Sequence, residues 1–245
     1  MLWGLNKIKM GLNKRLMEEI NKGDVKKKRL TLRPYLEGVK IGNKSDGKVY
    51  MVRDDRSRYF FPEEWIRFFD ATKSKKQGIF DVLINTGARI EEALNIKPED
   101  FDWERNNLTL KVTKIKAAKK ETIGRRRTFV ISSQFAKRMK AYINRHKIKE
   151  GNVLFPISKQ GVSQMLKRTL KRVGIKDWYM FSLHNIRKTH GNWLNALEVS
   201  PQEICMRLGH DMNTYLKHYG SANIFDRKDK TLMIKILGDV YGFKN

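Results

Sequence analysis

The chain has 245 residues, of which 40% are hydrophobic, so it can bury a core of domain size and differs in composition from disordered chains. Lys and Arg number 52 against 26 Asp and Glu, which gives a formal net charge of +26. Such self-repulsion destabilises a compact fold unless a polyanion offsets it, so nucleic acid is the expected partner. The single cysteine, Cys205, excludes an intramolecular disulfide, and five scattered His argue against a structural zinc cluster.

The sequence also lacks the features of a secreted or membrane protein. Its start, MLWGLNKIKMGLNKR, contains no sustained apolar run, and no later segment approaches the ~20 apolar residues that a membrane span requires. We therefore expect no membrane partner. The expected location is the cytoplasm of a prokaryotic cell or of a virus-infected host cell.

Residues 1–58 are expected to form a short basic N-terminal segment. A helix over 2–21 precedes two apolar runs within 30–53, which flank a polar turn and are typical of a β-hairpin. Residues 54–58 are polar and predict a linker. We interpret this segment as a candidate DNA-contacting appendage to a main domain over 59–245.

From residue 59 on, helix signals dominate. Pro62 and the two glutamates after it begin a helix in which Trp65, Phe68 and Phe69 recur at helical spacing. Two alternating runs, 108–115 and 126–131, predict strands joined by a basic turn. Further helices are predicted over 77–86, 89–95, 134–147, 160–173, 184–197, 201–208 and 214–219, with an amphipathic tail over 228–241. The fold class is therefore α+β, mainly helical, with one small antiparallel sheet.

Four separated pieces carry residues suited to phosphate chemistry. The first is TGARIEEAL, with Arg89 and Glu92 three residues apart. The second is a lysine-rich strand–turn–strand, KVTKIKAAKKETIGRRR. The third, LHNIRKTHGNWL, puts His184 and Arg187 on one helical face. The fourth, RLGHDMNTYLKHYG, places His210 nine residues before a tyrosine.

In this order the pieces resemble the catalytic domain of the tyrosine recombinases, or phage-type integrases. The family's patterns are T-G-x-R-x-x-E, a lysine on a β-hairpin, H-x-x-R, and L-G-H followed nine residues later by tyrosine. The sequence supplies Thr86-Gly87-Ala88-Arg89-Ile90-Glu91-Glu92, His184-Asn185-Ile186-Arg187, and Leu208-Gly209-His210 with Tyr219. Each triplet alone is a weak signal, whereas the ordered set, over about residues 59–222, is specific. The resemblance implies a catalytic domain with a small three-stranded antiparallel sheet.

The resemblance also implies the site and the reaction. The catalytic residues would be Arg89, Lys114, His184, Arg187, His210 and Tyr219, with Glu92 supporting Arg89. The protein would be a site-specific DNA recombinase or integrase that cleaves and rejoins strands through a 3′-phosphotyrosine, without a metal or other cofactor. Its partner would be double-stranded DNA, on which it assembles as a homo-tetramer, with a monomer expected in the absence of DNA.

Elementary chemistry agrees with these roles. The transition state at a phosphodiester spreads negative charge over the non-bridging oxygens, and guanidinium forks such as Arg89 and Arg187 match those oxygens. Attack by the Tyr219 phenol gives an aryl phosphate that conserves the bond energy for rejoining. By resemblance, His184 assists the proton transfer and His210 hydrogen-bonds the phosphate.

The lysine has two candidates. Lys114 fits the family best as the general acid that protonates the departing 5′-oxygen, and Lys116, of the same strand parity, is the alternative. The other cations of this hairpin are expected to contact the DNA backbone without reading its sequence: Lys119, Lys120, Arg125 and Arg126, together with Lys116 if it is not the acid. Tyr215 is the rival of Tyr219 as nucleophile, but the nine-residue spacing favours Tyr219 and leaves Tyr215 for the core.

Two other functions stay open at this point. The same residues could relax DNA in the manner of a type IB topoisomerase, or the fold could serve a catalytically silent DNA-binding protein. Residues 1–58 are too short and too hairpin-like to match the helical DNA-clamping domain that usually precedes the catalytic domain in this family. The tail over 228–241 could dock on a neighbouring protomer or equally on its own domain.

Overall fold

The computed structural model describes residues 40–43, 49–52, 58–111, 126–218 and 225–240. The chain divides into two units, residues 1–57 and 58–245. In the first unit, strands β1 (Lys40–Asn43) and β2 (Val49–Val52) pair antiparallel, which confirms the predicted hairpin. The helix predicted over 2–21 lies outside the described residues.

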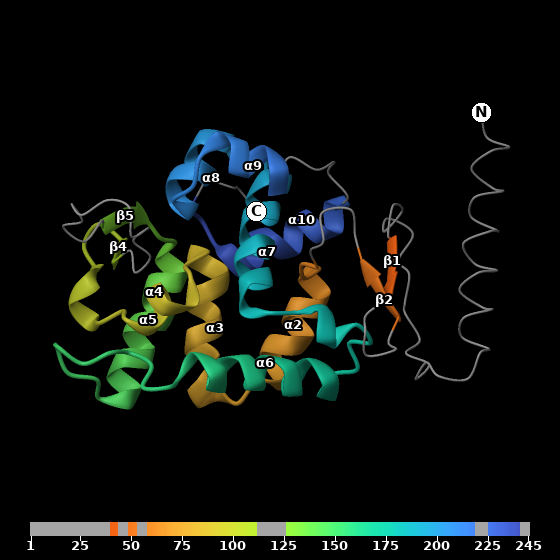
Figure 1. Cartoon of the computed structure of the whole chain (residues 1–245). Helices are drawn as coiled ribbons and strands as arrows, with labels where there is room; N and C mark the ends of the chain where they lie inside the picture. Colours follow the sequence, from red (N-terminus) through yellow and green to blue (C-terminus); the bar gives the residue numbers. More distant parts are fainter. Residues whose placement is uncertain (1–39, 44–48, 53–57, 112–125, 219–224, 241–245) are drawn as a thin grey trace, which may run out of the picture. The chain divides into compact units, whose positions relative to one another are not determined.

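The second unit is mainly helical, as predicted (Figure 1). Two short 3-10 helices cover Pro98–Asp100 and Trp178–Met180. The α-helices are α2 (Pro62–Ala71), α3 (Ser74–Thr86), α4 (Ile90–Leu94), α5 (Ser133–His146), α6 (Lys159–Arg172), α7 (Leu183–Ala196), α8 (Pro201–Leu208), α9 (Met212–His218) and α10 (Arg227–Leu237).

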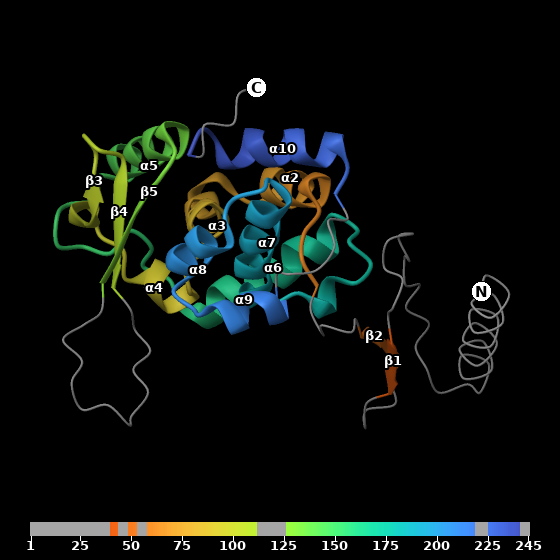
Figure 2. The same cartoon turned by 90° about the horizontal axis from the view of Figure 1, so that it is seen from above.

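Helix α3 forms the centre of this unit. Every residue from Gly78 to Thr86 is buried, because α3 packs against α5 on one side and α7 on the other (Figures 1 and 2). Aromatic rings fill the space toward α2, where the Phe68 and Phe80 centroids lie 4.9 Å apart edge to face. Phe69, which follows Phe68 on this helix, is only half-buried.

A three-stranded antiparallel sheet lies at one end of the unit, beside α4 and α5 (Figures 1 and 2). Its strands, in spatial order, are β3 (Phe101–Asp102), β4 (Asn107–Lys111) and β5 (Arg126–Val130). Leu108 faces Phe129 and Leu110 faces Arg127 across the β4–β5 pair. The predicted sheet is therefore confirmed, although β3 is too short to show an alternating pattern in the sequence.

The turn between α3 and α4 differs from the prediction in a way that matters for the site. Gly87 ends α3 in the left-handed conformation, with φ 61°, and α4 begins only at Ile90. Arg89, expected in the first turn of a helix, instead has extended backbone (φ −68°, ψ 149°) directly before it. Its backbone N–H thus lies at the helix start, where no backbone carbonyl of the helix can accept from it.

Two segments at the ends of this unit pack against its helices, one predicted to be a linker and one whose docking partner the sequence left undecided. Arg58, expected in a polar linker, is buried and pairs with Glu64 at 2.8 Å and Asp177 at 2.6 Å, which offsets the cost of burying its charge. The tail helix α10 lies on α2, α3 and α7 of its own chain and buries Met233 and Leu237. In the described part of the chain, no helix has the length and apolar character needed to cross a membrane.

Candidate active site

The T-G-x-R turn brings the ends of three helices together. A Cβ on Gly87 would lie 2.5 Å from Leu208 Cδ2 and 2.6 Å from His190 Cδ2, so only glycine fits between α7 and α8. The left-handed backbone at Gly87 favours glycine for a second reason. This close approach directs the chain from α3 into Arg89 next to the helix that carries His184 and Arg187.

Arg89 is braced by Glu92. The Glu92 carboxylate accepts from the Arg89 backbone N–H at 2.9 Å and from Arg89 Nη1 at 2.9 Å. The Glu92 side chain is fully buried, whereas 29% of the Arg89 side chain is exposed. The pair is therefore more than a surface ion pair, because the buried carboxylate holds a guanidinium that still faces solvent.

Arg187 joins the ends of α3 and α8. Its Nη1 donates to the Gly87 carbonyl at 2.7 Å, and its Nη2 donates to the Leu208 carbonyl. Only 3% of Arg187 is exposed, and carbonyl oxygens at helix ends carry partial negative charge that stabilises a buried cation. His184 lies one turn earlier on α7 and is exposed.

His210 follows the end of α8 and lies within the electrostatic reach of both arginines. Burial, the charge of Arg187 and then the charge of Arg89 lower its pKa from 6.5 to about 4, against a raising contribution from Asp211. The imidazole is therefore neutral at neutral pH and can donate one hydrogen bond without adding a full charge. The structure thus brings Arg89, Arg187 and His210 into one neighbourhood.

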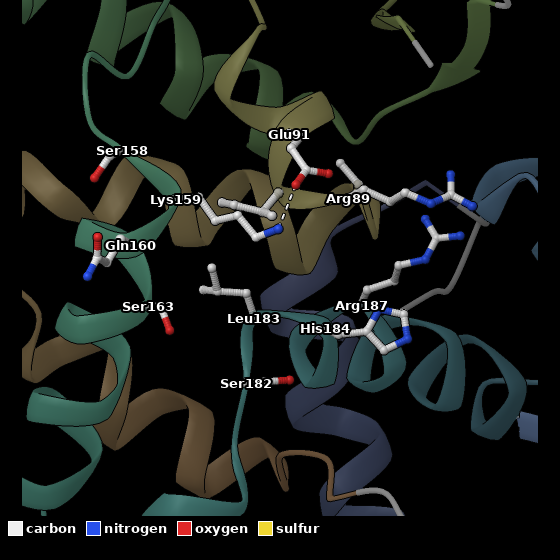
Figure 3. Close-up of a pocket in the computed structure, with 12 residues that line it drawn as sticks. Arg89, Glu91, Ser158, Lys159, Gln160, Ser163, Ser182, Leu183, His184 and Arg187 are labelled. Carbon is white, nitrogen blue, oxygen red and sulfur yellow. Dashed lines mark hydrogen bonds and ion pairs between the residues drawn. The ribbon is translucent and has the colours of Figure 1, made fainter. Parts of the chain in front are cut away.

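A cleft of about 810 Å³ opens beside these residues. Arg89, His184 and Arg187 line one side of it, and the start of α6 lines the other, where Lys159 pairs with Glu91 at 2.6 Å. Figure 3 shows the Arg89 and Arg187 guanidinium groups extending in the same direction, with the His184 imidazole beside Arg187. The arrangement suits an anionic group with several oxygens.

Of the remaining residues that the sequence singled out, two lie within the part of the chain that the structure describes. Arg126 lies exposed on β5. Tyr215 is buried, its hydroxyl lies 2.5 Å from Asn195 Oδ1, and burial raises the pKa of its phenol, so it packs in the core of the domain. The others lie outside the described residues: Lys114, Lys116, Lys119, Lys120, Arg125 and Tyr219.

Comparison with known families decides which class of protein carries this site. The sequence model of the Phage integrase family matches residues 59–224. The chain belongs to the phage integrase family. No curated protein sequence matches it.

Solved structures of tyrosine recombinases share the fold. XerA recombinase is similar with a TM-score of 0.54 at 20% identity, over 73% of this chain and 64% of that one. The Tn1549 transposon integrase in complex with transposon right end DNA gives 0.56 at 16%, over 74% and 66%. XerH site-specific recombinase bound to difH substrate gives 0.51 at 16%, over 72% and 53%. These identities establish the fold alone, and this phage integrase family member spans about two thirds or less of each neighbour's length.

One residue of this neighbourhood escaped the sequence analysis. Arg127 on β5 donates from Nη2 to Glu92 Oε2 at 2.5 Å, so the carboxylate that braces Arg89 has a second cationic partner. The only sequence signal was its place in the basic run at the start of the strand, which predicted DNA contacts for its neighbours. A contact between residues 35 positions apart leaves no local pattern.

His190, also on α7, predicts how stability depends on pH. Burial of the ring and the charges of Arg207 and Arg187 lower its pKa from 6.5 to about 3, and the hydrogen bond that its Nδ1 donates to the Ile84 carbonyl, at 2.7 Å, only partly opposes this shift. The unfolded chain takes up this proton below pH 6.5 and the folded chain does not, so stability falls as pH decreases. At pH 5 the expected loss relative to pH 7.5 is about 2 kcal/mol.

Urea unfolding at pH 7.5 and pH 5 measures this loss. In the His190→Gln variant, whose amide can still donate to Ile84, the difference between the two pH values should shrink by about 2 kcal/mol. Equal pH dependence in the two proteins would show that another group is responsible.

Proposed function

We propose that this phage integrase family member is a site-specific DNA recombinase that cleaves and rejoins DNA strands through a 3′-phosphotyrosine on Tyr219. The observation that carries the proposal is that Arg89 and Arg187 line one cleft and that His210 lies within the electrostatic reach of both arginines. Helix α9 ends at His218, directly before Tyr219 in the sequence. A phosphodiester held by the two guanidinium groups would then meet a phenol from the neighbouring segment.

The proposed step balances without a metal. The Tyr219 oxygen attacks phosphorus and loses its proton, the bond from phosphorus to the 5′-oxygen breaks, and that oxygen takes up a proton. Arg89 and Arg187 stabilise the charge that develops on the non-bridging oxygens. His184 would assist removal of the phenol proton, and Lys114, or alternatively Lys116, would protonate the leaving 5′-oxygen. Rejoining is the reverse reaction.

Double-stranded DNA is the proposed partner. The net charge of +26 favours a polyanion, and two of the structural neighbours, the Tn1549 integrase and XerH, were solved in complex with DNA. Exposed Arg126 and the basic hairpin residues Lys116, Lys119, Lys120 and Arg125 would contact the phosphate backbone. We further propose that residues 1–58 form a DNA-contacting appendage and that strand exchange takes place in a homo-tetramer on DNA.

The test is capture of the covalent intermediate. The full chain is incubated, with EDTA present, with nicked duplexes of random sequence, in which a short 5′-hydroxyl fragment diffuses away after cleavage and traps the adduct. We expect an SDS-resistant protein–DNA band that retains the label on the 5′ end of the cleaved strand, enriched for one sequence. No adduct on any duplex would leave a silent DNA-binding protein, and adducts without sequence preference would favour topoisomerase-like relaxation.

A further inference from the structure

We propose that Arg127 is a positioning residue for the phosphate-binding arginine Arg89 and acts through Glu92. The same side chain aligns Arg89 with the segment that carries His210. This inference rests on the proposed strand-cleaving function and extends it to a residue of the sheet. The observations that carry it are the contacts of Arg127 with Glu92 on one side and Gly209 on the other.

The first contact divides the charge of one carboxylate between two guanidinium groups. Glu92 Oε1 accepts from Arg89 Nη1, and Oε2 accepts from Arg127 Nη2 and from the Arg89 backbone N–H. The Glu92 side chain is fully buried, and 12% of the Arg127 side chain is exposed. Two cations and one anion leave a net charge of +1 at this cluster. Without Arg127, Arg89 and Glu92 would form a neutral pair with weaker attraction for a phosphate.

The second contact joins the sheet to the segment that carries His210. A Cβ on Gly209 would lie 2.9 Å from Arg127 Cδ, so the arginine side chain lies directly over the glycine that precedes His210. Gly209 also has a left-handed backbone, with φ 63°. Arg127 therefore lies between the α4 carboxylate that braces Arg89 and the end of α8, and a shift of its side chain would move both.

Arg127 does not use all of its hydrogen-bond donors. Its Nε and Nη1 are buried and have no hydrogen-bond partner among the described residues. Burial and the charge of Arg89 lower the pKa of Arg127, while Glu92 raises it. An interior arginine with two unsatisfied N–H groups is costly for stability, and such cost is commonly found at functional sites. An apolar residue of similar size would fill the same space without that cost.

The test compares single-turnover adduct formation with DNA affinity, on the nicked random duplexes described above. In Arg127→Met we expect the adduct to form about 10²-fold more slowly, because a small displacement of Arg89 has effects of that size on rate. Duplex affinity measured by fluorescence anisotropy should change by less than about threefold, since one cation among 52 Lys and Arg is removed. The control, Arg138→Met, removes an arginine that pairs with Asp81 outside the cleft and should leave the rate unchanged.

A double-mutant cycle distinguishes positioning from a structural role. If Arg127 acts through the Glu92 charge, Arg127→Met in a Glu92→Gln background should slow the reaction by less than about threefold, whereas independent roles multiply. Arg127→Lys and Arg127→Gln form a second pair in case Met prevents folding: Lys, which keeps the charge, should react at least about tenfold faster than Gln. Multiplicative effects in the cycle, or equal rates for wild type and Gln, would overturn the inference while the wild-type adduct still supports the proposed function. Failure of wild type to form any adduct would overturn both.

Discussion

Replacing Tyr219 with Phe should abolish the covalent adduct while DNA binding persists. Phenylalanine lacks the oxygen that would form the bond to phosphorus, so no residual rate through this residue is expected. The measurement is the SDS-resistant band on nicked duplexes, with anisotropy on the same duplexes as the binding readout. Affinity should stay within about threefold of wild type, since removal of a neutral hydroxyl changes no phosphate-neutralising charge.

Tyr215→Phe is the matched control, because it removes a phenol oxygen from the same segment. The Tyr215 hydroxyl lies 2.5 Å from Asn195 Oδ1 and is buried, so its loss should lower the free energy of unfolding by about 1–2 kcal/mol. The adduct should form at the wild-type rate wherever the variant is folded. An adduct that survives Tyr219→Phe and disappears with Tyr215→Phe would exchange the roles of the two tyrosines.

Replacing Arg187 with Lys should slow adduct formation by about 10³-fold, within the range found when an arginine that stabilises a phosphoryl transition state is removed. The Arg187 guanidinium donates to the Gly87 and Leu208 carbonyls and also lines the cleft. A lysine ammonium is a single point charge that cannot span both carbonyls and still present a planar fork to phosphate. We also expect a loss of about 1–3 kcal/mol in the free energy of unfolding, because buried carbonyls lose their donor.

The effect on the reaction must be separated from the effect on stability. Arg207→Lys is a suitable control, because Arg207 is equally buried, at 3% exposed, and donates to the Val130 carbonyl at 2.7 Å, but it does not line the cleft. Urea unfolding identifies conditions in which both variants are fully folded, and single-turnover rates are compared there. Similar rates in the two variants would show that Arg187 serves only to hold the helices together.

Arg89 and Arg187 are already held in place by partners within the protein before any DNA binds. Arg187 is stabilised by helix-end carbonyls and Arg89 by the Glu92 carboxylate, so each guanidinium is held in place by a partner within the fold. Burial, together with the positive charges of Arg187 and Arg89, lowers the pKa of His210 to about 4. A phosphate that enters it would meet groups already oriented, which reduces the reorganisation needed for catalysis.

The sequence by itself determined the family, the mainly helical fold and the sheet, and it singled out Arg89, His184, Arg187 and His210 as candidate site residues. These follow from short motifs and from capping and periodicity signals, which act over a few residues and therefore survive without tertiary information. Several helix ends differ from the predicted ones by one to three residues, as at Ser74 and Ile90, because end positions depend on neighbouring packing.

Only the tertiary structure decided which long-range partners complete the site. The Arg127–Glu92 pair joins β5 to α4, the Arg187 hydrogen bonds join α7 to the ends of α3 and α8, and α10 packs on its own chain. The physical reason is that a buried charge pairs, and an apolar helix face packs, with groups that come close only in the folded chain. The spacing of residues along the sequence does not identify these partners. Tyr215 shows the same limit: the sequence assigned it to the core, but only the structure identifies its hydrogen-bond partner, Asn195 on another helix.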